Sequence, residues 1–261
     1  MACDLRTHAR RMASGRVYLI GAGPGDPELM TLRAVRALGE ADVVLVDELV
    51  DERCLAYTKG RVVRVGKRGG CASTPQVFIE KLMIHLAAAG NVVARLKGGD
   101  PFIFGRGGEE LAALQAAGIA AEVVPGITAG LGIAAELGIP LTRRGSANSV
   151  TFVAGHSAQP VDWAGLRAAR TTLAIYMAAA RLRETVDAML AGGFPPSMPA
   201  CIVQNGTQRA QRTVFAPLAC LAECAENAGI ASPALVLVGE VVFQSASYNQ
   251  GAETHHVRRH H

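Results

Sequence analysis

The run VVARLKGGDPFIFGRGGEE, residues 92–110, joins a short apolar strand to a helix through a glycine-rich loop. A short continuous apolar strand is typical of a parallel sheet that is covered on both faces. Glycine lets a backbone approach a ligand closely and adopt positive φ angles. Ligands of open parallel sheets bind beyond the carboxyl ends of the strands. The run therefore predicts an α/β fold with ligand-binding loops at its strand ends.

The same strand-loop-helix pattern extends through the first half of the chain. A Thr74-Pro75 pair predicts a helix start with threonine as N-cap and proline at the first helical position. Strands separated by helices favour a parallel sheet with right-handed crossovers. We expect strands at 16–20, 42–46, 62–65, 92–96 and 121–124, and helices at about 28–41, 75–89 and 108–117. The continuous apolar runs at 42–46 and 62–65 predict that these strands are covered on both faces.

The second half of the chain has a different pattern, with a polar, basic segment at 140–148 after a helix near 128–137. The short gap between Gln204 and Thr213 allows an antiparallel pair of strands through Asn205-Gly206. Further strands are expected at 150–154, 173–176, 200–204, 213–215 and 235–238, and helices near 162–169, 181–192 and 217–227. We therefore expect a parallel-sheet N-terminal α/β domain at 16–126 and a mixed-sheet C-terminal α/β domain at 127–245, with tails at 1–15 and 246–261.

Composition limits the class of protein. The chain has 261 residues, of which 50% are hydrophobic, so it can bury a substantial core. Aromatic residues make up 5% and the net charge is +4, which argues against a nucleic-acid partner but fits an anionic substrate met by local arginines. The sequence has no apolar run of membrane-spanning length, so we expect no membrane partner. Six irregularly spaced cysteines indicate reduced thiols and a cytoplasmic location, and we expect no metal site in the fold.

The first glycine loop, GAGPGDP at 21–27, invites comparison with two phosphate-binding motifs. A dinucleotide fingerprint is excluded because Asp26 stands where the third glycine should be. A P-loop at Gly66-Lys67 is excluded because Arg68 follows in place of serine or threonine. The loops therefore indicate another kind of ligand.

Five motifs occur in the order shown by one known family. They are VYLIGAGPGDP at 17–27, GKR at 66–68, RLKGGDPFIFGRGGEE at 95–110, VPGITA at 124–129 and GIPLT at 138–142. In this order they resemble the tetrapyrrole methylases, and in particular the uroporphyrinogen-III C-methyltransferases, over about residues 16–243. The resemblance implies two α/β domains with a site in the cleft between them, bound S-adenosylmethionine and a homodimer.

The resemblance also implies a set of cofactor residues. They are Pro24, Gly98, Gly99, Asp100, Ile103, Thr128, Ala129, Met177 and Gly206. The residue types support several of them: the Asp100 carboxylate can accept from ribose hydroxyls or from the methionine ammonium group, and Thr128 begins a predicted helix whose free N–H groups suit a polar ligand. For Met177 the alternative is ordinary core packing.

The implied reaction is the methylation of uroporphyrinogen III at C2 and C7, which gives precorrin-2 by way of precorrin-1 and releases S-adenosylhomocysteine. Precorrin-2 is a precursor of sirohaem, cobalamin and haem d1. By resemblance Asp47 is the proton acceptor and Lys67 the proton donor. The alternatives are a helix or turn cap for Asp47 and a solvated surface charge for Lys67. Arg106 and Glu109, three residues apart, are rival catalytic residues. The alternatives are a plain salt bridge between them, or a helix N-terminal charge for Glu109.

The substrate is a polycarboxylate, which arginines can grip with forked donors. The candidate substrate-binding residues are Arg68, Arg106, Arg143 and Arg144. Three rival functions remain at this point: a methylase of the same fold that acts on a later corrin precursor, a ribosomal-RNA methyltransferase of this fold, and a tetrapyrrole carrier without a cofactor site.

Overall fold

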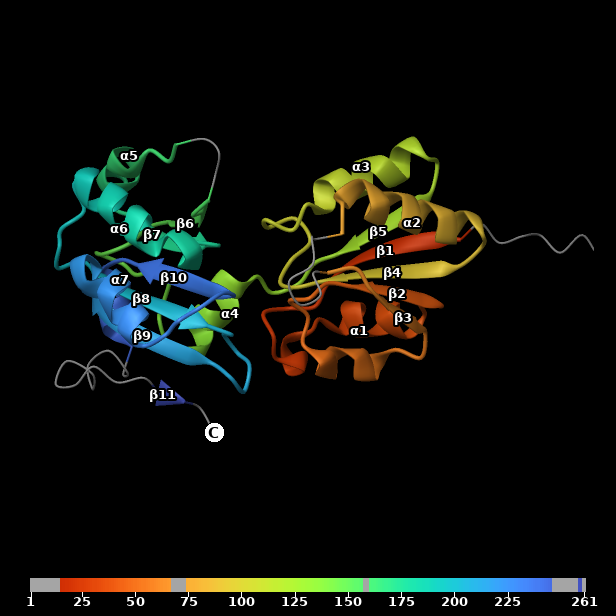
Figure 1. Cartoon of the computed structure of the whole chain (residues 1–261), viewed down its shortest axis with the longest axis horizontal. Helices are drawn as coiled ribbons and strands as arrows, with labels where there is room; N and C mark the ends of the chain where they lie inside the picture. Colours follow the sequence, from red (N-terminus) through yellow and green to blue (C-terminus); the bar gives the residue numbers. More distant parts are fainter. Residues whose placement is uncertain (1–14, 67–73, 157–159, 246–257, 260–261) are drawn as a thin grey trace, which may run out of the picture.

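The computed structural model describes residues 15–66, 74–156, 160–245 and 258–259. Figure 1 shows two sheets with their helices side by side, joined by the segment that leads from strand β5 to helix α4. We call the parallel-sheet part the first domain and the mixed-sheet part the second domain. The boundary expected at 126/127 falls in this joining segment, between β5 and α4.

The first domain contains a five-stranded parallel sheet, as expected from the sequence. The strand order is β3-β2-β4-β1-β5, and every pairing is parallel. The strands are β1 (Arg16–Gly21), β2 (Val43–Val46), β3 (Arg61–Arg64), β4 (Val92–Lys97) and β5 (Ala120–Val124). All carboxyl ends therefore lie at one edge of the sheet, where the glycine-rich loops begin.

Helices cover both faces of this sheet. They are η1 (Pro27–Leu29), α1 (Leu32–Gly39), η2 (Glu52–Tyr57), α2 (Gln76–Ala88) and α3 (Gly107–Ala116). One apolar core includes Ile20, Val44 and Leu96, and a second, built from alternating residues of the same strands, includes Leu19 and Leu45. The two cores fix the strand ends rigidly from both sides.

Three local expectations for the first domain are wrong. The first helix begins at Leu32, not near 28, because the Thr31 side chain accepts from the Ala34 amide and a separate 3-10 turn precedes it. Thr74 is not the N-cap of α2; Pro75 holds that position, with no side-chain cap bond. Strand β3 is not covered on both faces, because it lies at the sheet edge with Val62 37% exposed.

The second domain contains a mixed sheet with the order β11-β9-β8-β10-β7-β6. Its strands are β6 (Val150–Ala154), β7 (Thr172–Tyr176), β8 (Pro199–Gln204), β9 (Arg212–Pro217), β10 (Ala234–Val238) and β11 (Arg258–Arg259). The β6–β7 pair is parallel, and β8–β9 is antiparallel as expected, although the connecting turn spans 205–211 and not two residues alone. Its helical segments are α4 (Ala129–Glu136), α5 (Trp163–Ala168), η3 (Ala179–Arg181), α6 (Leu182–Ala191), α7 (Leu218–Asn227) and η4 (Glu240–Gln244).

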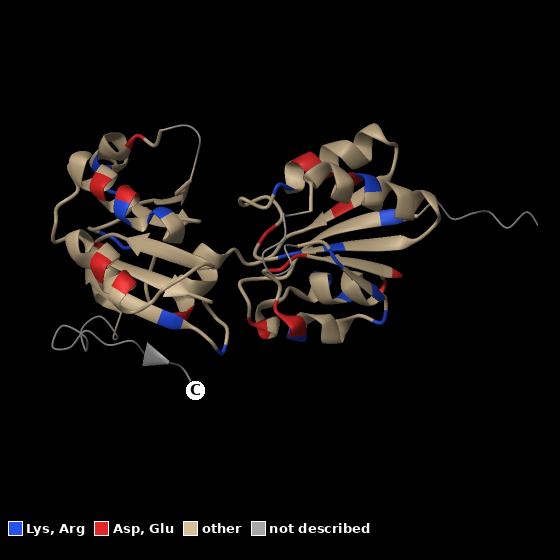
Figure 2. Ribbon diagram, viewed as in Figure 1, with Lys and Arg blue, Asp and Glu red and all other residues tan. Residues whose placement is uncertain are grey.

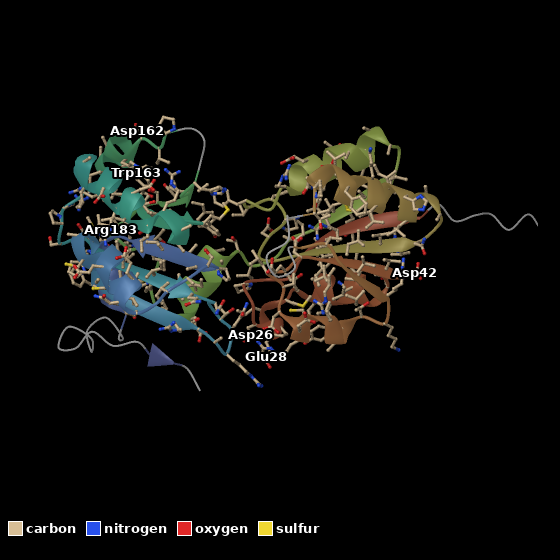
Figure 3. All side chains as sticks on the ribbon, viewed as in Figure 1. Asp26, Glu28, Asp42, Asp162, Trp163 and Arg183 are labelled. Carbon is tan, nitrogen blue, oxygen red and sulfur yellow. The ribbon has the colours of Figure 1, made fainter. Side chains whose placement is uncertain are left out.

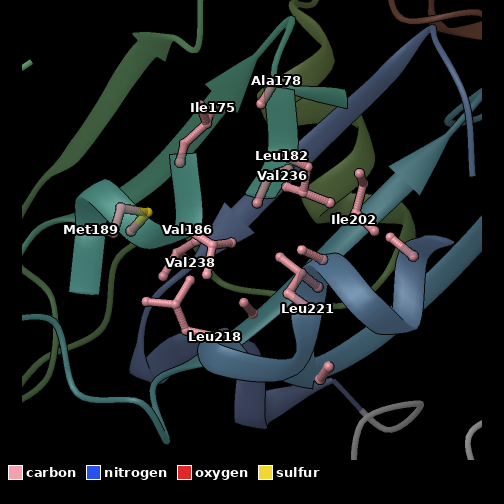
Figure 4. Close-up of a cluster of buried hydrophobic side chains, with 14 of the residues drawn as sticks. Ile175, Ala178, Leu182, Val186, Met189, Ile202, Leu218, Leu221, Val236 and Val238 are labelled. Carbon is pink, nitrogen blue, oxygen red and sulfur yellow. The ribbon is translucent and has the colours of Figure 1, made fainter. Parts of the chain in front are cut away.

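Two apolar cores cover the faces of the second sheet. Figure 4 shows the first, in which side chains of α6 and α7, such as Val186 and Leu221, pack on Ile202 and Val236 of the sheet. Helix α4 covers the opposite face through Ile133 and its neighbours. Because α4 follows β5 directly, this packing holds the second domain at the carboxyl edge of the first sheet.

Candidate active site

The loops after β1, β4 and β5 are joined through their backbones. The Ala22 amide donates to the Lys97 carbonyl at 2.8 Å, and Gly23 and Gly99 bond each other in both directions, at 3.2 and 2.7 Å. A Cβ atom on Gly126 would lie 2.2 Å from the Gly99 carbonyl oxygen, so no larger residue fits there. The glycines of three motifs therefore serve first to bring three strand ends together.

Asp100 anchors its own loop to the end of β5. One carboxylate oxygen accepts from the Phe102 amide at 2.8 Å, and the other accepts from the Gly126 amide at 3.0 Å. Each oxygen keeps a second lone pair. Asp100 is therefore held in place for a ligand donor, and its role in cofactor binding stays a prediction.

Helix α4 is where the predicted cofactor segments meet. A Cβ atom on Gly99 would lie 3.7 Å from the Thr128 Cα atom and 3.8 Å from the Ala129 nitrogen. The Pro24 ring lies against Gly132 of α4. Gly206 is so close to the helix that a Cβ atom there would clash with the Ile133 side chain. Residues from both domains, far apart in sequence, thus lie around this short helix.

Tyr176, at the end of β7, is a site residue that the sequence did not reveal. Its hydroxyl lies 2.7 Å from Thr128 Oγ1 and accepts from the Gly130 amide at 2.8 Å. Burial raises the pKa of Tyr176, although these two hydrogen bonds act in the opposite direction, so the phenol stays protonated at neutral pH. The expectation that the amides at the start of α4 are free for a ligand is wrong for Gly130, because its amide donates to the Tyr176 hydroxyl.

Met177 follows Tyr176 and has a left-handed backbone, with φ of 58°. Its side chain is 43% exposed, so the alternative of core packing is wrong. The Tyr176 ring also contacts Phe104, with ring centroids 5.0 Å apart, and Phe104 follows Ile103 in the loop after β4. Ile103 and Met177 are therefore both adjacent to the aromatic contact that joins the two domains.

The loop between β8 and β9 makes a second contact between the domains. Thr207 Oγ1 accepts from the Asp26 amide at 3.1 Å, and a Cβ atom on Gly25 would lie 2.6 Å from the Gln208 side chain. Figure 3 labels Asp26 on the side of the first domain that faces this loop. Thr207 has φ of 63°, which is strained for a β-branched residue. The strain is held by a short bond from the Thr207 amide to the Gln211 side chain, at 2.6 Å.

Asp47, the predicted proton acceptor, directly follows β2. Its carboxylate accepts from Arg95 at 2.5 Å, and its other oxygen lies 3.8 Å from Lys97 Nζ. The Asp47 side chain is 28% exposed, whereas Arg95 and Lys97 are 2% and 3% exposed. Two cations therefore hold this carboxylate from its buried side. The contacts of the Asp47 side chain are thus ion pairs and not those of a cap.

A second carboxylate, Glu110 of α3, lies beneath these cations and is fully buried. It accepts from Arg95 Nε at 3.0 Å, and Lys97 Nζ lies 3.1 Å from both of its oxygens. Burial lowers the pKa of Lys97, and the nearby Arg95 adds to this, while Glu110 and Asp47 act in the opposite direction. Figure 2 shows positively and negatively charged positions close together on the part of the first domain that faces the second domain. The sequence signal that could have predicted this buried charge cluster is the presence of an arginine and a lysine inside the apolar run VVARLK, residues 92–97.

Arg106 and Glu109 form the salt bridge that was their alternative. The guanidinium donates to the carboxylate at 2.6 Å, and both side chains are more than half exposed. The bond to Arg106 lowers the pKa of Glu109, which makes that carboxylate a weaker base. Arg106 keeps donors that face solvent, so the geometry suits it better for binding an anion than it suits Glu109 for accepting a proton.

The other predicted arginines lie elsewhere. Arg143 and Arg144 are exposed in a turn that leads into β6, and the Thr172 amide at the start of β7 bonds to Ser149 of this segment at 3.0 Å. Tyr176 lies at the opposite end of β7, so the structure does not bring this turn to the aromatic contact. Lys67 and Arg68 lie outside the described residues.

Within residues 15–66, 74–156, 160–245 and 258–259, no group of three or more histidine, cysteine, aspartate or glutamate residues is placed to hold a metal ion. No helix within them combines the length and the apolar character needed to cross a bilayer.

Comparisons with known proteins agree with this arrangement. The family model of Tetrapyrrole (Corrin/Porphyrin) Methylases matches residues 16–222. A uroporphyrinogen-III C-methyltransferase of Pseudomonas aeruginosa is 51% identical, over 87% of this chain and 94% of the relative. A siroheme synthase of Methylococcus capsulatus is 47% identical over 92% of this chain but only 52% of the relative, so the chain spans about half of that protein.

Solved structures are also similar. A uroporphyrin-III C-methyl transferase of Thermus thermophilus, complexed with S-adenyl homocysteine, has a TM-score of 0.76 and 42% identity, covering 87% of this chain and 93% of that one. A cobalt precorrin-4 methyltransferase has a TM-score of 0.79 and 26% identity, covering 89% and 98%. By its motifs, its two sheets and these matches, the chain belongs to the tetrapyrrole methylase family.

Proposed function

We propose that this chain methylates uroporphyrinogen III at C2 and C7 with S-adenosylmethionine, giving precorrin-2 by way of precorrin-1. The observation that carries the proposal is the meeting of the predicted cofactor segments around helix α4, where Gly99 approaches the first residues, the Pro24 ring approaches Gly132 and Gly206 approaches Ile133. The 51% identity to a protein named for this activity supports the same substrate.

The residues around helix α4 suit S-adenosylmethionine. Glycine backbone at Gly98 and Gly99 leaves room for close approach, the Asp100 carboxylate can accept from an ammonium or hydroxyl donor, and Met177 offers an exposed apolar contact. The remaining proposed cofactor residues are Pro24, Ile103, Thr128, Ala129 and Gly206. When bound, S-adenosylmethionine supplies a methyl group that its sulfonium charge already activates, and S-adenosylhomocysteine is the product.

The protein's main tasks are alignment and proton removal. The electron-rich pyrrole carbon attacks the methyl group in line, and positioning supplies much of the rate. A proton then leaves the alkylated macrocycle, for which a general base contributes. Asp47 is the proposed acceptor because its carboxylate is partly exposed and fixed by Arg95. Lys67 is the proposed donor, and Arg106 and Glu109 remain rivals for catalytic roles.

Substrate binding is proposed beside Phe104, on the side that faces the second domain. A cavity of about 490 Å³ lies between Phe104 and residues of β6 and α5 of the second domain. Arg106, two residues from Phe104, is exposed and suits a carboxylate arm of the substrate. Arg68 is proposed for another arm. Arg143 and Arg144 were expected to bind the substrate too, but their turn lies at the opposite end of β7 from Tyr176 and neither lines this cavity, so that role stays a prediction. A homodimer and a cytoplasmic location also remain predictions.

The test is incubation with uroporphyrinogen III and S-adenosylmethionine labelled with carbon-13 in the methyl group. We expect a product that has gained two methyl groups, with a singly methylated intermediate at early times, by mass spectrometry. Carbon-13 NMR of the product then gives the positions, which should be C2 and C7. No methylation of this substrate would contradict the proposal.

The second candidate is a methylase that acts on a later corrin precursor. It is favoured by the similarity to cobalt precorrin-4 methyltransferase, whose TM-score of 0.79 exceeds that of the Thermus thermophilus enzyme, although its identity is 26% against 42%. Turnover of a later corrin precursor, with none of uroporphyrinogen III, would establish this function instead.

A further inference from the structure

We propose that Glu110 and Lys97 are positioning residues that tune Asp47 as a proton acceptor, with opposite electrostatic effects. The inference rests on the proposed function, since Asp47 is the acceptor only if that proposal holds. Neither residue is open to a ligand, because Glu110 is fully buried and Lys97 is 3% exposed. Any effect on the reaction therefore passes through Asp47.

The four charged side chains form a closed ring. Asp47 bonds Arg95 at 2.5 Å, Arg95 bonds Glu110 at 3.0 Å, and Lys97 lies 3.1 Å from Glu110 and 3.8 Å from Asp47. Two carboxylates alternate with two cations, so the ring is neutral when all four groups are charged. Gln76 of α2 adds a neutral donor to Glu110 at 3.2 Å.

Burial makes the ring electrostatically strong. Three of its members are excluded from water, so their charges are poorly screened and act on each other at short range. Buried ion pairs add little stability over apolar residues of similar size. Burying these charges costs desolvation free energy, so a gain in stability is a poor explanation for the ring. An electrostatic effect on Asp47, the one partly exposed carboxylate of the ring, explains it better.

The two positioning residues act with opposite signs. Glu110 adds negative charge behind Arg95 and Lys97, which helps Asp47 take up a proton. Lys97 adds positive charge near the other Asp47 oxygen, which helps Asp47 release one. Among the described residues, the charged groups facing Asp47 are Arg95 and Lys97 from β4 and, behind them, Glu110 from α3; α2 contributes the neutral Gln76.

The experiment compares Glu110→Gln, Lys97→Met and the double variant, with kcat measured against pH at saturating substrate and S-adenosylmethionine. Removing the Glu110 charge should move the acid limb of the profile about one pH unit lower. Removing the Lys97 charge should move it about one pH unit higher. The double variant removes one charge of each sign, so its profile should return close to that of the unaltered protein.

Glu226→Gln is the matched control, because this glutamate pairs with Arg183 on the surface of the second domain and should leave the profile unchanged. A purely structural role would lower activity without opposite shifts, so shifts of the same sign, or none, would overturn the proposal. If Glu110→Gln does not fold, the upward shift of Lys97→Met and its reversal in the double variant still decide the question.

Carbon-13 NMR of the Asp47 carboxyl, without substrate, separates this inference from the proposed function. Opposite changes in the Asp47 titration midpoint in the two single variants would support the ring's effect on this carboxylate. If Asp47→Asn also kept full activity, the proposed acceptor role would fail while the electrostatic effect stood. Unchanged Asp47 titration in both single variants would refute the inference, whatever the activity.

Discussion

The two sides of the candidate site are built in different ways. The first-domain side consists of contiguous glycine-rich loops whose backbones bond one another, as at Gly23 and Gly99. The second-domain side consists of separate residues, such as Tyr176 and Thr207, that come from distant strands and loops. A continuous loop leaves a motif in the sequence, whereas an assembly of single residues does not.

The chemistry of the two sides differs as well. Asp47, Arg95, Lys97 and Glu110 place paired charges at the first-domain strand ends. The second domain offers the Tyr176 hydroxyl and the exposed Met177 side chain, without a charged group in the contacts described above. We therefore expect changes on the first side to affect turnover most, and changes on the second side to affect cofactor affinity and stability.

Asp47→Asn should have the largest effect. The amide keeps the shape of the side chain but accepts a proton poorly, so kcat should fall about 100-fold or more. S-adenosylhomocysteine affinity, measured by calorimetry, should stay within about twofold. The reason is that Asp47 contacts Arg95 and Lys97 and not the proposed cofactor residues around helix α4. Full activity of this variant would show that Asp47 is not an essential base. It would also contradict the proposal that changes on the first-domain side affect turnover most.

Arg106→Ala should come next. The exposed guanidinium is proposed to bind a substrate carboxylate, so its loss should raise KM for the tetrapyrrole about tenfold or more, about 1.4 kcal/mol, while cofactor affinity stays intact. Arg183→Ala is the control, because Arg183 also forms an exposed ion pair but lies on the second domain with Glu226. Equal kinetics for the two variants would show that Arg106 is a surface salt bridge only.

The same contrast explains what could be predicted from the sequence. The parallel sheet, and the glycine-rich loops at its carboxyl edge, could be predicted from periodicity and from glycine spacing, which are local signals. The Tyr176 contact with Thr128 was not predictable, because the partners are 48 residues apart and each fits an ordinary strand end or helix start by itself. The ion pairs of Arg95 and Lys97 with Glu110 were not predicted for a related reason. Glu110 lies on α3, and only the packing of this helix on the sheet brings it to the two cations.

Tyr176→Phe tests the second side. The change leaves the Gly130 amide and Thr128 hydroxyl without their buried partner, so the free energy of unfolding should fall by about 1–3 kcal/mol. S-adenosylhomocysteine affinity should fall a few-fold, because the start of α4 loses its anchor, whereas the acid limb of the kcat profile should not move.

Tyr18→Phe is the matched control in the first domain. The Tyr18 hydroxyl bonds to the half-exposed Glu40 at 2.9 Å, which water can replace as a partner, so its loss should cost less than that of Tyr176. Chemical denaturation of both variants gives the comparison. A smaller loss for Tyr176→Phe than for Tyr18→Phe would contradict the anchoring role of Tyr176.

The smallest effect is expected at the contact between the β8–β9 loop and the first domain. Thr207→Ala removes the acceptor of the Asp26 amide, but this amide is only partly buried and can turn to water, so cofactor affinity should fall about threefold. Thr207→Ser keeps the acceptor and removes the β-branch, which φ of 63° disfavours, so it should bind as well as the unaltered protein and be slightly more stable. If serine lowers affinity as much as alanine does, the strain and not the hydrogen bond positions this loop, and the second side of the site depends on backbone geometry in the same way as the first.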